Sequence, residues 1–413
     1  MGGLRSANQQ VTTQYAQDGR YIAAQKDDYM LSWYDDDLAW SDDGGETWIN
    51  AYAWGAVFSI IPIHDKFITF AHIFSNGDCI FCTYKTVWRT TDKLLTVNEI
   101  TPTGYTFHTP ISASRPGAYF QSLNIDNYQQ VGAVEMLAFS AYCNTPKAGA
   151  AAIVCWYTID NGATIKPFWE AGQNPYMTDT GAQSGQYGGT LLGDALEPLI
   201  TRHCHSLCFD GVDTFYGFFG DQSPRDNEAE TVEEIHILSW VYDEILDSWT
   251  GPTVVHSDSN SGETDRFKGT GGNIIDGYLY WGSDATSAVA GGSEVGIFKW
   301  RIADGDIVNN SERILDFTPD SDMINSYVVL DLKIDPVTGF GVASLDRAGL
   351  DGKLACFWNF GREGNYLIVD PDPANTQTHI KIWPKNSDGF FKVDTNYATG
   401  EEQTPNLFIK SMF

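Results

Sequence analysis

The sequence holds two segments whose side chains could bind a metal ion. Residues 203–208 read His-Cys-His-Ser-Leu-Cys, and Cys79 and Cys82 form a Cys-x-x-Cys spacing. Imidazole and thiolate groups are common protein ligands of zinc. Both segments are typical of strands, in which successive side chains point to opposite faces. Cys204 and Cys208 are then predicted on one face with both histidines on the other, and the Cys-x-x-Cys pair points apart, so we expect buried cysteines and no metal site.

The seven cysteines are few and scattered, at positions 79, 82, 143, 155, 204, 208 and 356. Small disulfide-stapled domains carry dense, even sets, so we predict reduced thiols. No cofactor is predicted. The acidic segment 258–265 resembles a calcium loop, but its glycine lies one place too early for an EF-hand. Calcium on an acidic loop therefore stays an open alternative.

Carboxylates offer a second kind of chemistry, because a glycosidase needs two of them a few ångströms apart. The chain has 54 Asp and Glu against 25 Lys and Arg, and a formal charge of −29. Asp213 and Asp284, each just beyond a predicted strand, are candidates, but so many carboxylates leave the choice of a pair open. The same charge repels nucleic-acid phosphate and anionic lipid, so neither is an expected partner.

The elements that must position these groups are short strands. Aromatic residues make up 14% of the chain, which also holds 40 glycines. Seven Asp-led turns each separate two apolar segments, as in a hairpin, where Asp and Gly tolerate positive φ. Their spacing fits one four-stranded propeller blade per turn, with loop insertions. The turns are Asp18-Gly19, Asp65-Lys66, Asp126-Asn127, Asp210-Gly211, Asp276-Gly277, Asp335-Pro336 and Asp388-Gly389.

A second pattern recurs where a strand rich in Trp or Tyr enters a polar turn. The side chain of an Asp, Ser or Thr can bond the amides of its own turn, and Gly takes the positive φ. We expect the closing Trp48 to be largely buried between strands, so that these residues are structural rather than catalytic. The best copy comprises Ser41, Asp43, Gly45, Thr47 and Trp48; the second keeps Thr90, Asp92 and Thr96; the third keeps Thr158, Asp160, Gly162 and Thr164.

These three turns resemble the Asp box, or BNR repeat, of sialidase-like β-propellers. The resemblance implies an all-β fold, a single β-propeller domain over residues 1–413 with seven four-stranded blades. It also implies that the boxes lie on the outer rim, away from the mouth where ligands bind. The last repeat lacks a strand, and we expect residues within 1–17, near Ala7 to Thr13, to complete its sheet and close the propeller.

Sialidases of this family hold a substrate carboxylate with three arginines, whose planar groups suit bidentate contacts. Their early arginine motif is absent here, since Arg20 is followed by Tyr-Ile-Ala. Arg115, Arg202 and Arg266 could form a triad, but nothing in the sequence selects them. We therefore assign no catalytic residue and expect no sialidase activity. A glycoside hydrolase acting at the propeller mouth is the alternative.

Five long insertions interrupt the predicted strands, at 98–116, 170–198, 221–234, 257–273 and 282–294. Loops of this length in a regular array are usually either functional surfaces or mobile decoration. Tyr176 and Tyr187, in the longest insertion, could stack on sugar rings and are the predicted binding residues. The insertions therefore favour a recognition surface for neutral glycans or for protein neighbours in a larger assembly.

We predict a non-enzymatic recognition or structural β-propeller, of the kind carried on a virion exterior such as a phage tail or capsid. The N-terminal residues lack the apolar core of a signal peptide, and no apolar run approaches the length that spans a bilayer. If the protein is not a virion component, we expect it to be cytoplasmic or exported by a non-classical route, with no membrane insertion.

Overall fold

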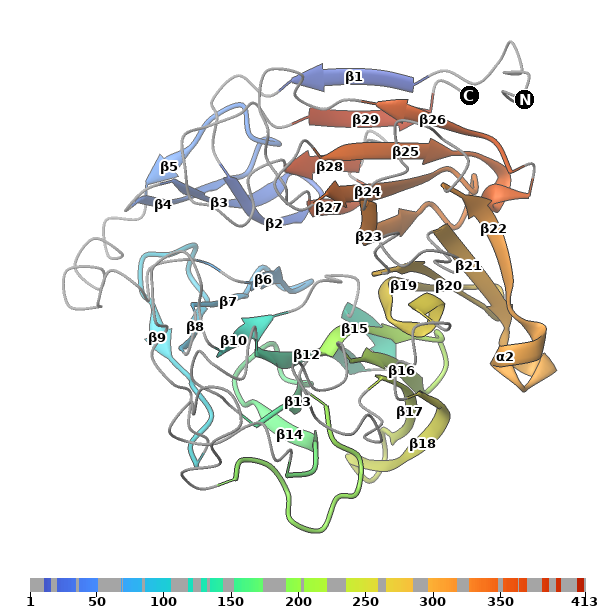
Figure 1. The fold of residues 1–413 in the computed structure, drawn as a ribbon. Helices are drawn as coiled ribbons and strands as arrows, with labels where there is room; N and C mark the ends of the chain where they lie inside the picture. Colours follow the sequence, from blue (N-terminus) through green and yellow to red (C-terminus); the bar gives the residue numbers. More distant parts are fainter. Residues whose placement is uncertain are drawn as a thin grey trace. The chain divides into compact units, whose positions relative to one another are not determined.

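Strands run through the whole chain in a computed structural model (Figure 1). In the described residues the regular elements are strands, with few exceptions. These are the single-turn helix α2 (Ile307–Asn310) and the 3-10 turns η3 (Asp265–Phe267), η4 (Ile302–Asp304) and η5 (Asn359–Gly361). Among those residues no helix is long and apolar enough to cross a membrane. The predicted all-β class is confirmed. The structure describes residues 11–15, 21–34, 37–50, 68, 70–83, 86–104, 118–121, 128–131, 134–143, 152–173, 191–201, 204–220, 235–258, 265–284, 296–317, 327–347, 352–362, 364–369, 381–385, 391–394 and 407–411.

The chain divides into two compact units, and the unit of residues 23–261 carries four antiparallel sheets, the first beginning with β2. Its strands follow one another as meanders, the organisation of a propeller blade. The first sheet is β2 (Tyr21–Lys26), β3 (Tyr29–Tyr34), β4 (Asp37–Ser41) and β5 (Ile49–Asn50); the second is β6 (Phe70–Ile73), β7 (Cys79–Cys82), β8 (Val87–Thr90) and β9 (Asn98–Glu99); the third is β10 (Ala118–Gln121), β12 (Val134–Cys143), β13 (Val154–Thr158) and β14 (Lys166–Glu170), with β11 (Tyr128–Val131) paired to β12; the fourth is β15 (Cys204–Phe209), β16 (Thr214–Phe219), β17 (Ile235–Asp243) and β18 (Ser248–Asp258).

The second unit, residues 1–22 and 262–413, carries three further sheets of the same kind. The fifth sheet is β19 (Gly269–Ile275), β20 (Tyr278–Ser283), β21 (Gly296–Arg301) and β22 (Glu312–Asp316); the sixth is β23 (Tyr327–Ile334), β24 (Gly341–Arg347), β25 (Lys353–Phe357) and β26 (Tyr366–Val369); the last is β27 (Lys381–Lys385), β28 (Phe391–Asp394), β29 (Leu407–Ser411) and β1 (Val11–Tyr15). The β-propeller class expected from the sequence is confirmed by these repeated four-stranded meanders.

The last sheet joins the two ends of the chain. Strand β1 pairs antiparallel with β29, with Val11 opposite Ser411 and Tyr15 opposite Leu407 (Figure 1). Completion of the final sheet by an N-terminal strand is therefore confirmed, although the strand begins at Val11 and Ala7 lies outside the described residues. Six blades are continuous along the sequence, not the predicted seven, because the remaining sheet is shared between the ends.

The Asp-led turns match the first hairpin of a sheet only in the later part of the chain. Three of them join the first and second strands of the fourth, fifth and sixth sheets, at Asp210-Gly211, Asp276-Gly277 and Asp335-Pro336. In the first two sheets that hairpin turns elsewhere, through Asp27 at φ 52° and Gly77 at φ 87°. The predicted phase was wrong there because a left-handed residue is what the turn requires, and a single Asp or Gly supplies it. The turns at Asp18, Asp65, Asp126 and Asp388 lie outside the described residues.

Aromatic and aliphatic side chains fill the gaps between neighbouring sheets. Trp156 is fully buried between the second and third sheets, and Trp240 between the third and fourth. In the other unit, Phe357 packs between the fifth and sixth sheets and Phe391 between the sixth and the last. Each such ring removes on the order of 200 Å² from water, so these gaps hold the core of each unit.

Candidate functional site

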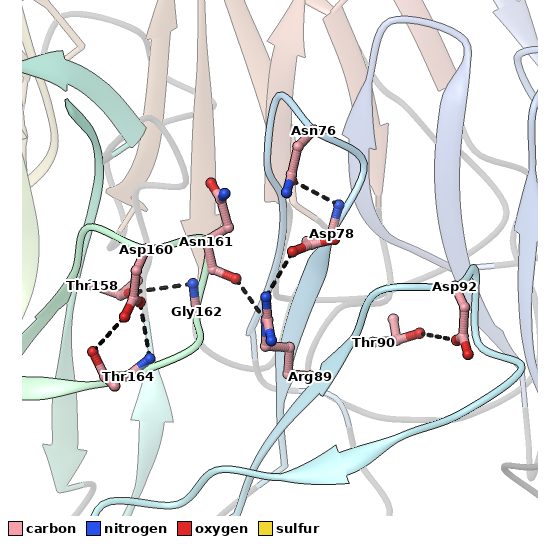
Figure 2. Close-up of polar contacts among 10 residues, drawn as sticks. All are labelled: Asn76, Asp78, Arg89, Thr90, Asp92, Thr158, Asp160, Asn161, Gly162 and Thr164. Carbon is pink, nitrogen blue, oxygen red and sulfur yellow. Dashed lines mark hydrogen bonds and ion pairs between the residues drawn. The ribbon is translucent and has the colours of Figure 1, made fainter. Parts of the chain in front are cut away.

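The three predicted boxes are turns between the third and fourth strands of the first three sheets. In the third box the Thr158 hydroxyl donates to Asp160 Oδ1 at 3.0 Å and accepts from the Gly162 amide at 3.0 Å. Asp160 also accepts from the amide and hydroxyl of Thr164, at 2.9 and 2.7 Å (Figure 2). The boxes at 41–48 and 90–97 make the same four hydrogen bonds, at 2.6–3.1 Å.

Two consecutive residues of each box adopt a left-handed conformation, and the second of them is the one that the Ser or Thr hydroxyl binds. Gly45 has φ 89° and Gly162 has φ 74°, and the second box places Leu94 there at φ 67°. A side-chain carbon at Gly162 would lie 2.3 Å from Ile80 Cγ2 of the second sheet, so glycine is also needed for close packing. The side chain of Leu94 is instead 1% exposed, and its burial offsets the backbone strain. The second box therefore keeps its geometry although its sequence has lost the glycine.

The box aspartates are held as carboxylates. Hydrogen bonds from Ser41 and then Thr47 lower the pKa of Asp43 to about 2. Burial acts to raise the pKa values of Asp92 and Asp160, but bonds from the Thr hydroxyls and amides of their own turns outweigh it and lower both. A general acid needs a pKa raised towards the working pH. The electrostatics of these turns therefore oppose an acid role.

Each later box also reaches the preceding sheet. Arg89 on β8 donates from Nε to the Asn161 carbonyl at 2.9 Å and pairs through Nη2 with Asp78 Oδ2 at 2.7 Å (Figure 2). In the same way Lys93 of the second box pairs with Asp42 of the first. Because Asn161 and Lys93 both have φ 55°, the left-handed turn is what directs these residues towards the neighbour.

The fourth sheet achieves the same contact without a box. Asp247, at φ 48° in the β17–β18 turn, accepts from the hydroxyls of Tyr157 and Tyr242 at 2.9 and 3.0 Å and pairs with Lys166 of the third sheet. Trp249 packs on this group, with its ring centroid 5.3 Å from that of Tyr157. Burial and the Asp247 carboxylate raise the pKa values of both tyrosines, so they stay protonated as donors.

Trp48 lies beside its own box turn and is partly buried, which fits its prediction, but it lacks the full burial of a core ring. A side-chain carbon at Gly45 would lie 3.3 Å from Trp48 Cζ2, so the indole lies over its own turn. The strand that follows, β5, has only two residues, both exposed. It is too short to carry the ring into the gap between sheets, where fully buried tryptophans such as Trp156 lie.

The cysteines are buried as predicted in the six described cases: Cys79, Cys82, Cys155, Cys204, Cys208 and Cys356. One prediction about their faces was wrong. A bulge between Cys204 and Ser206 shifts the register of β15, so that Cys204 packs with Leu207 and Phe209 and Cys208 lies on the opposite face. Within the described residues no cluster of three His, Cys, Asp or Glu side chains is arranged to hold a metal.

The residues considered for catalysis are not brought together where the structure describes them. Arg266 donates to the Val308 carbonyl at 2.9 Å, while Arg115 and Arg202 lie outside the described residues. Asp284 pairs with Lys268 at 2.9 Å, and Asp213 accepts from the hydroxyl of the adjacent Thr214. The two carboxylates belong to different sheets and form no glycosidase pair in any described contact.

The predicted recognition residues and much of the predicted surface lie outside the described residues. This holds for Tyr176 and Tyr187, for insertion 221–234, and for most of the calcium-like segment, at 259–264. Of the longest insertion, residues 170–173 and 191–198 are described, and Gly172 and Asp194 form an isolated bridge directly after the last strand of the third sheet. There the Gly172 amide donates to the Leu199 carbonyl at 2.7 Å, and the Trp169 indole donates to Glu197 at 3.0 Å.

A polar group that sequence patterns missed lies at the end of the fourth sheet remote from the β17–β18 turn. His236 on β17 is opposite Ser257 on β18, and its Nδ1 lies 2.8 Å from Ser257 Oγ. Its Nε2 lies 2.9 Å from the Ile200 carbonyl. On the third sheet, burial and then Asp194 raise the pKa of Glu170. No spacing rule joins residues 200, 236 and 257, since strand pairing brings His236 to Ser257 and a separate segment outside the strands brings the Ile200 carbonyl to His236.

The turns of the fourth sheet carry the other notable surface feature. Ile245 and Leu246, adjacent in the β17–β18 turn, are 88% and 71% exposed, and Val212 in the β15–β16 turn is 69% exposed. The turns are neighbours, because the Tyr242 amide donates to the Asp213 carbonyl at 2.9 Å. The two turns therefore bring three exposed apolar side chains to the same end of the fourth sheet.

Comparisons with known proteins show no family for this chain. No family model and no curated protein matches the chain. Among solved structures, YCF48 from Cyanidioschyzon merolae is 13% identical over 97% of this chain and 98% of its own, with a TM-score of 0.47. A GH74 xyloglucanase from Xanthomonas campestris is 13% identical over 96% of this chain and 55% of its own, at 0.49. An α-L-arabinanase from Penicillium chrysogenum is 13% identical over 83% and 92%, at 0.42.

Proposed function

We propose that the chain is a recognition propeller that binds a protein partner through the turns of its fourth sheet. The observation that carries this proposal is the pair of exposed side chains of Ile245 and Leu246, with Val212 on the adjoining turn. Exposing such side chains costs a soluble protein colloidal stability unless a partner covers them. We call residues 210–214 and 243–247 the fourth-sheet tips.

Both tips are held in one conformation before any partner arrives. The Asp243 carboxylate accepts from the amides of Ile245 and Leu246, at 2.9 and 3.0 Å. Asp210 does the same for the amides of Val212, Asp213 and Thr214, at 2.8–3.1 Å. Ordering a loop on binding costs free energy, and these bonds remove much of that cost. The tips therefore suit docking better than a chain that must fold on contact.

The chemistry of the partner follows from the charge of the tips. Asp210, Asp213, Asp243 and Glu244 lie in the same two turns as the apolar side chains, and the chain as a whole has a formal charge of −29. A basic surface with apolar side chains would gain both electrostatic attraction and burial. We infer a basic, amphipathic protein partner. Two further proposals have support from the sequence alone. The acidic composition supports a place on a virion exterior, and Tyr176 and Tyr187 support binding of neutral glycans by the insertions.

The test is binding of a panel of basic amphipathic peptides at about 50 and about 500 mM salt. The fourth-sheet tips should bind at low salt and lose affinity as screening increases. Changing Ile245 and Leu246 together to serine should weaken binding by about tenfold or more, as hot-spot loss does. Val337→Ser, at a residue 84% exposed on the β23–β24 turn, is the matched control and should leave binding unchanged. Equal binding by both variants would refute the assignment.

A further inference from the structure

We propose that Ser257 is an activated nucleophile with His236 as its base, giving the chain an ester-cleaving activity beyond the proposed recognition function. The hydrogen bonds fix the proton positions. The Ile200 carbonyl, 2.9 Å from Nε2, can only accept, so Nε2 carries the proton. In the neutral ring Nδ1 is then an acceptor, and the Ser257 hydroxyl donates to it at 2.8 Å. This is the arrangement of a nucleophile, a base and a group that orients the base.

The base is held rigidly. His236 is 1% exposed, lies opposite Phe219 on one side and Ser257 on the other, and shares a sheet face with Leu238. The Ile200 carbonyl that orients it belongs to a chain segment tied to the third sheet. The tie is a hydrogen bond from the Gly172 amide, next to the third sheet, to the carbonyl of Leu199, which directly precedes Ile200.

The orienting segment is fixed a second time. Glu197 accepts from the Leu199 amide and from the Trp169 indole, both at 3.0 Å. A base kept in one orientation by surrounding structure loses no free energy to reorientation during reaction. The imidazole is therefore preorganised, and Ser257, which is half-buried at the end of β18, is the more exposed member of the pair.

The reaction these groups support is cleavage of a small, activated ester in two steps. Ser257 Oγ forms a bond to the ester carbonyl carbon, its proton moves to His236 Nδ1, and the bond from that carbon to the alcohol oxygen breaks as the alcohol takes the proton. Water then attacks the acyl-serine and gives a proton to Nδ1. The bond between Oγ and the acyl carbon breaks, Oγ regains the proton, and the carboxylic acid leaves. The only co-reactant is water.

A structural role for the same bonds makes a different prediction. If the chain of Ser257, His236 and Ile200 only fastens residues 191–201 to the fourth sheet, the serine has no unusual reactivity, and its loss costs stability alone. An activated serine reacts with electrophiles that an ordinary serine ignores. The two roles are therefore separated by reactivity of the native, unmutated protein.

The experiment treats the native chain with a fluorophosphonate probe and locates the label by peptide mass spectrometry. We expect labelling at Ser257, loss of it after heat denaturation, and at least about tenfold slower p-nitrophenyl acetate turnover in Ser257→Ala. Ser239→Ala is the matched control, because Ser239 is half-buried on the same sheet opposite Thr253 rather than a histidine. It should keep label and turnover.

An unlabelled Ser257 in native protein, beside a serine hydrolase that labels under the same conditions, would overturn the proposal. That result does not depend on whether any variant folds. Peptide binding by the fourth-sheet tips is measured separately and should be unchanged in Ser257→Ala, because the tips lie at the opposite end of β17 and β18. Failure of the esterase and failure of the recognition function are thus distinguishable.

Discussion

The box turns and the Ser257 group lie in the same unit but are built in opposite ways. In the box at 158–165 every bond that shapes the turn joins residues two to four positions apart. The Ser257 group joins residues 21 and 36 positions from His236, through strand pairing and a crossing segment. Local bonding makes the first visible as a motif and gives it a folding role, whereas the second exists only once the sheets have formed.

Removing an aromatic ring from between two sheets should cause the largest loss of stability, because both the box turns and the Ser257 group depend on the sheets. Trp240 is 1% exposed in the core between the third and fourth sheets. Trp240→Ala should lower the free energy of unfolding by about 3–5 kcal/mol through cavity formation. Denaturant titration measures this. A loss below about 1 kcal/mol would mean that the two sheets are not packed as described.

Breaking the contact between a box turn and the neighbouring sheet should cause the second largest loss of stability. Arg89 is 23% exposed at its side chain, and Arg89→Met removes the bonds to Asp78 and the Asn161 carbonyl while keeping most of the volume. We expect a loss of about 1–3 kcal/mol, because Asp78 is left partly buried without its partner. Arg301→Met is the control, since its pair with Asp304 is 57% and 46% exposed and should change stability by less than about 0.5 kcal/mol. Equal losses would remove the inter-sheet role from Arg89.

Trp48 should contribute less than a buried ring. Because the indole is half-buried over its own turn, Trp48→Ala should cost about 1–2 kcal/mol, clearly less than Trp240→Ala. Thermal melts of the two variants side by side give the order. If Trp48→Ala were the more damaging, the half-buried position would be incorrect.

The smallest effect is electrostatic. The pKa of Asp43 in the folded chain is about 2, below its usual 3.8. The carboxylate therefore stabilises the fold fully above pH 3.8, and this stabilisation is lost as the pH falls through the folded-state pKa. The melting-temperature gap between the native chain and Asp43→Asn should therefore be constant near pH 6 and narrow from about pH 4 to pH 2. A gap that widened on acidification would contradict the hydrogen-bonding of the box.

Local chemistry decided how far the sequence could predict the fold. The boxes at Ser41, Thr90 and Thr158 were located from their own residues, and the N-terminal closing strand from the missing partner of the last sheet. The first-hairpin turns of the first two sheets were not, because the predicted turns all began with Asp, in most cases followed by another turn-favouring residue. The first sheet turns at Asp27 without a glycine, and the second turns at Asn76-Gly77, which begins with Asn. The bulge at Cys204 was equally invisible, since an inserted residue is defined by the partner strand.

The candidate sites were harder to predict for a related reason. Ile245 and Leu246 look like ordinary strand residues, and only the turn formed by Asp243 and Asp247 exposes them. His236 lies in an apolar strand where histidine is usually a buried core residue. Its pairing with Ser257 depends on the register of β17 and β18, which includes two shifts along the pair.

The central claim is that the box turns serve folding while recognition belongs to the fourth-sheet tips. The most direct measurement compares Asp160→Ala with the double serine variant of Ile245 and Leu246, recording thermal melting and basic-peptide binding for each. Asp160→Ala should lower stability by about 1 kcal/mol, as loss of a turn cap does, and leave binding intact below the melting temperature. The tip variant should melt like the native chain and lose binding. Lost binding in the folded Asp160 variant, with binding retained in the tip variant, would contradict the claim.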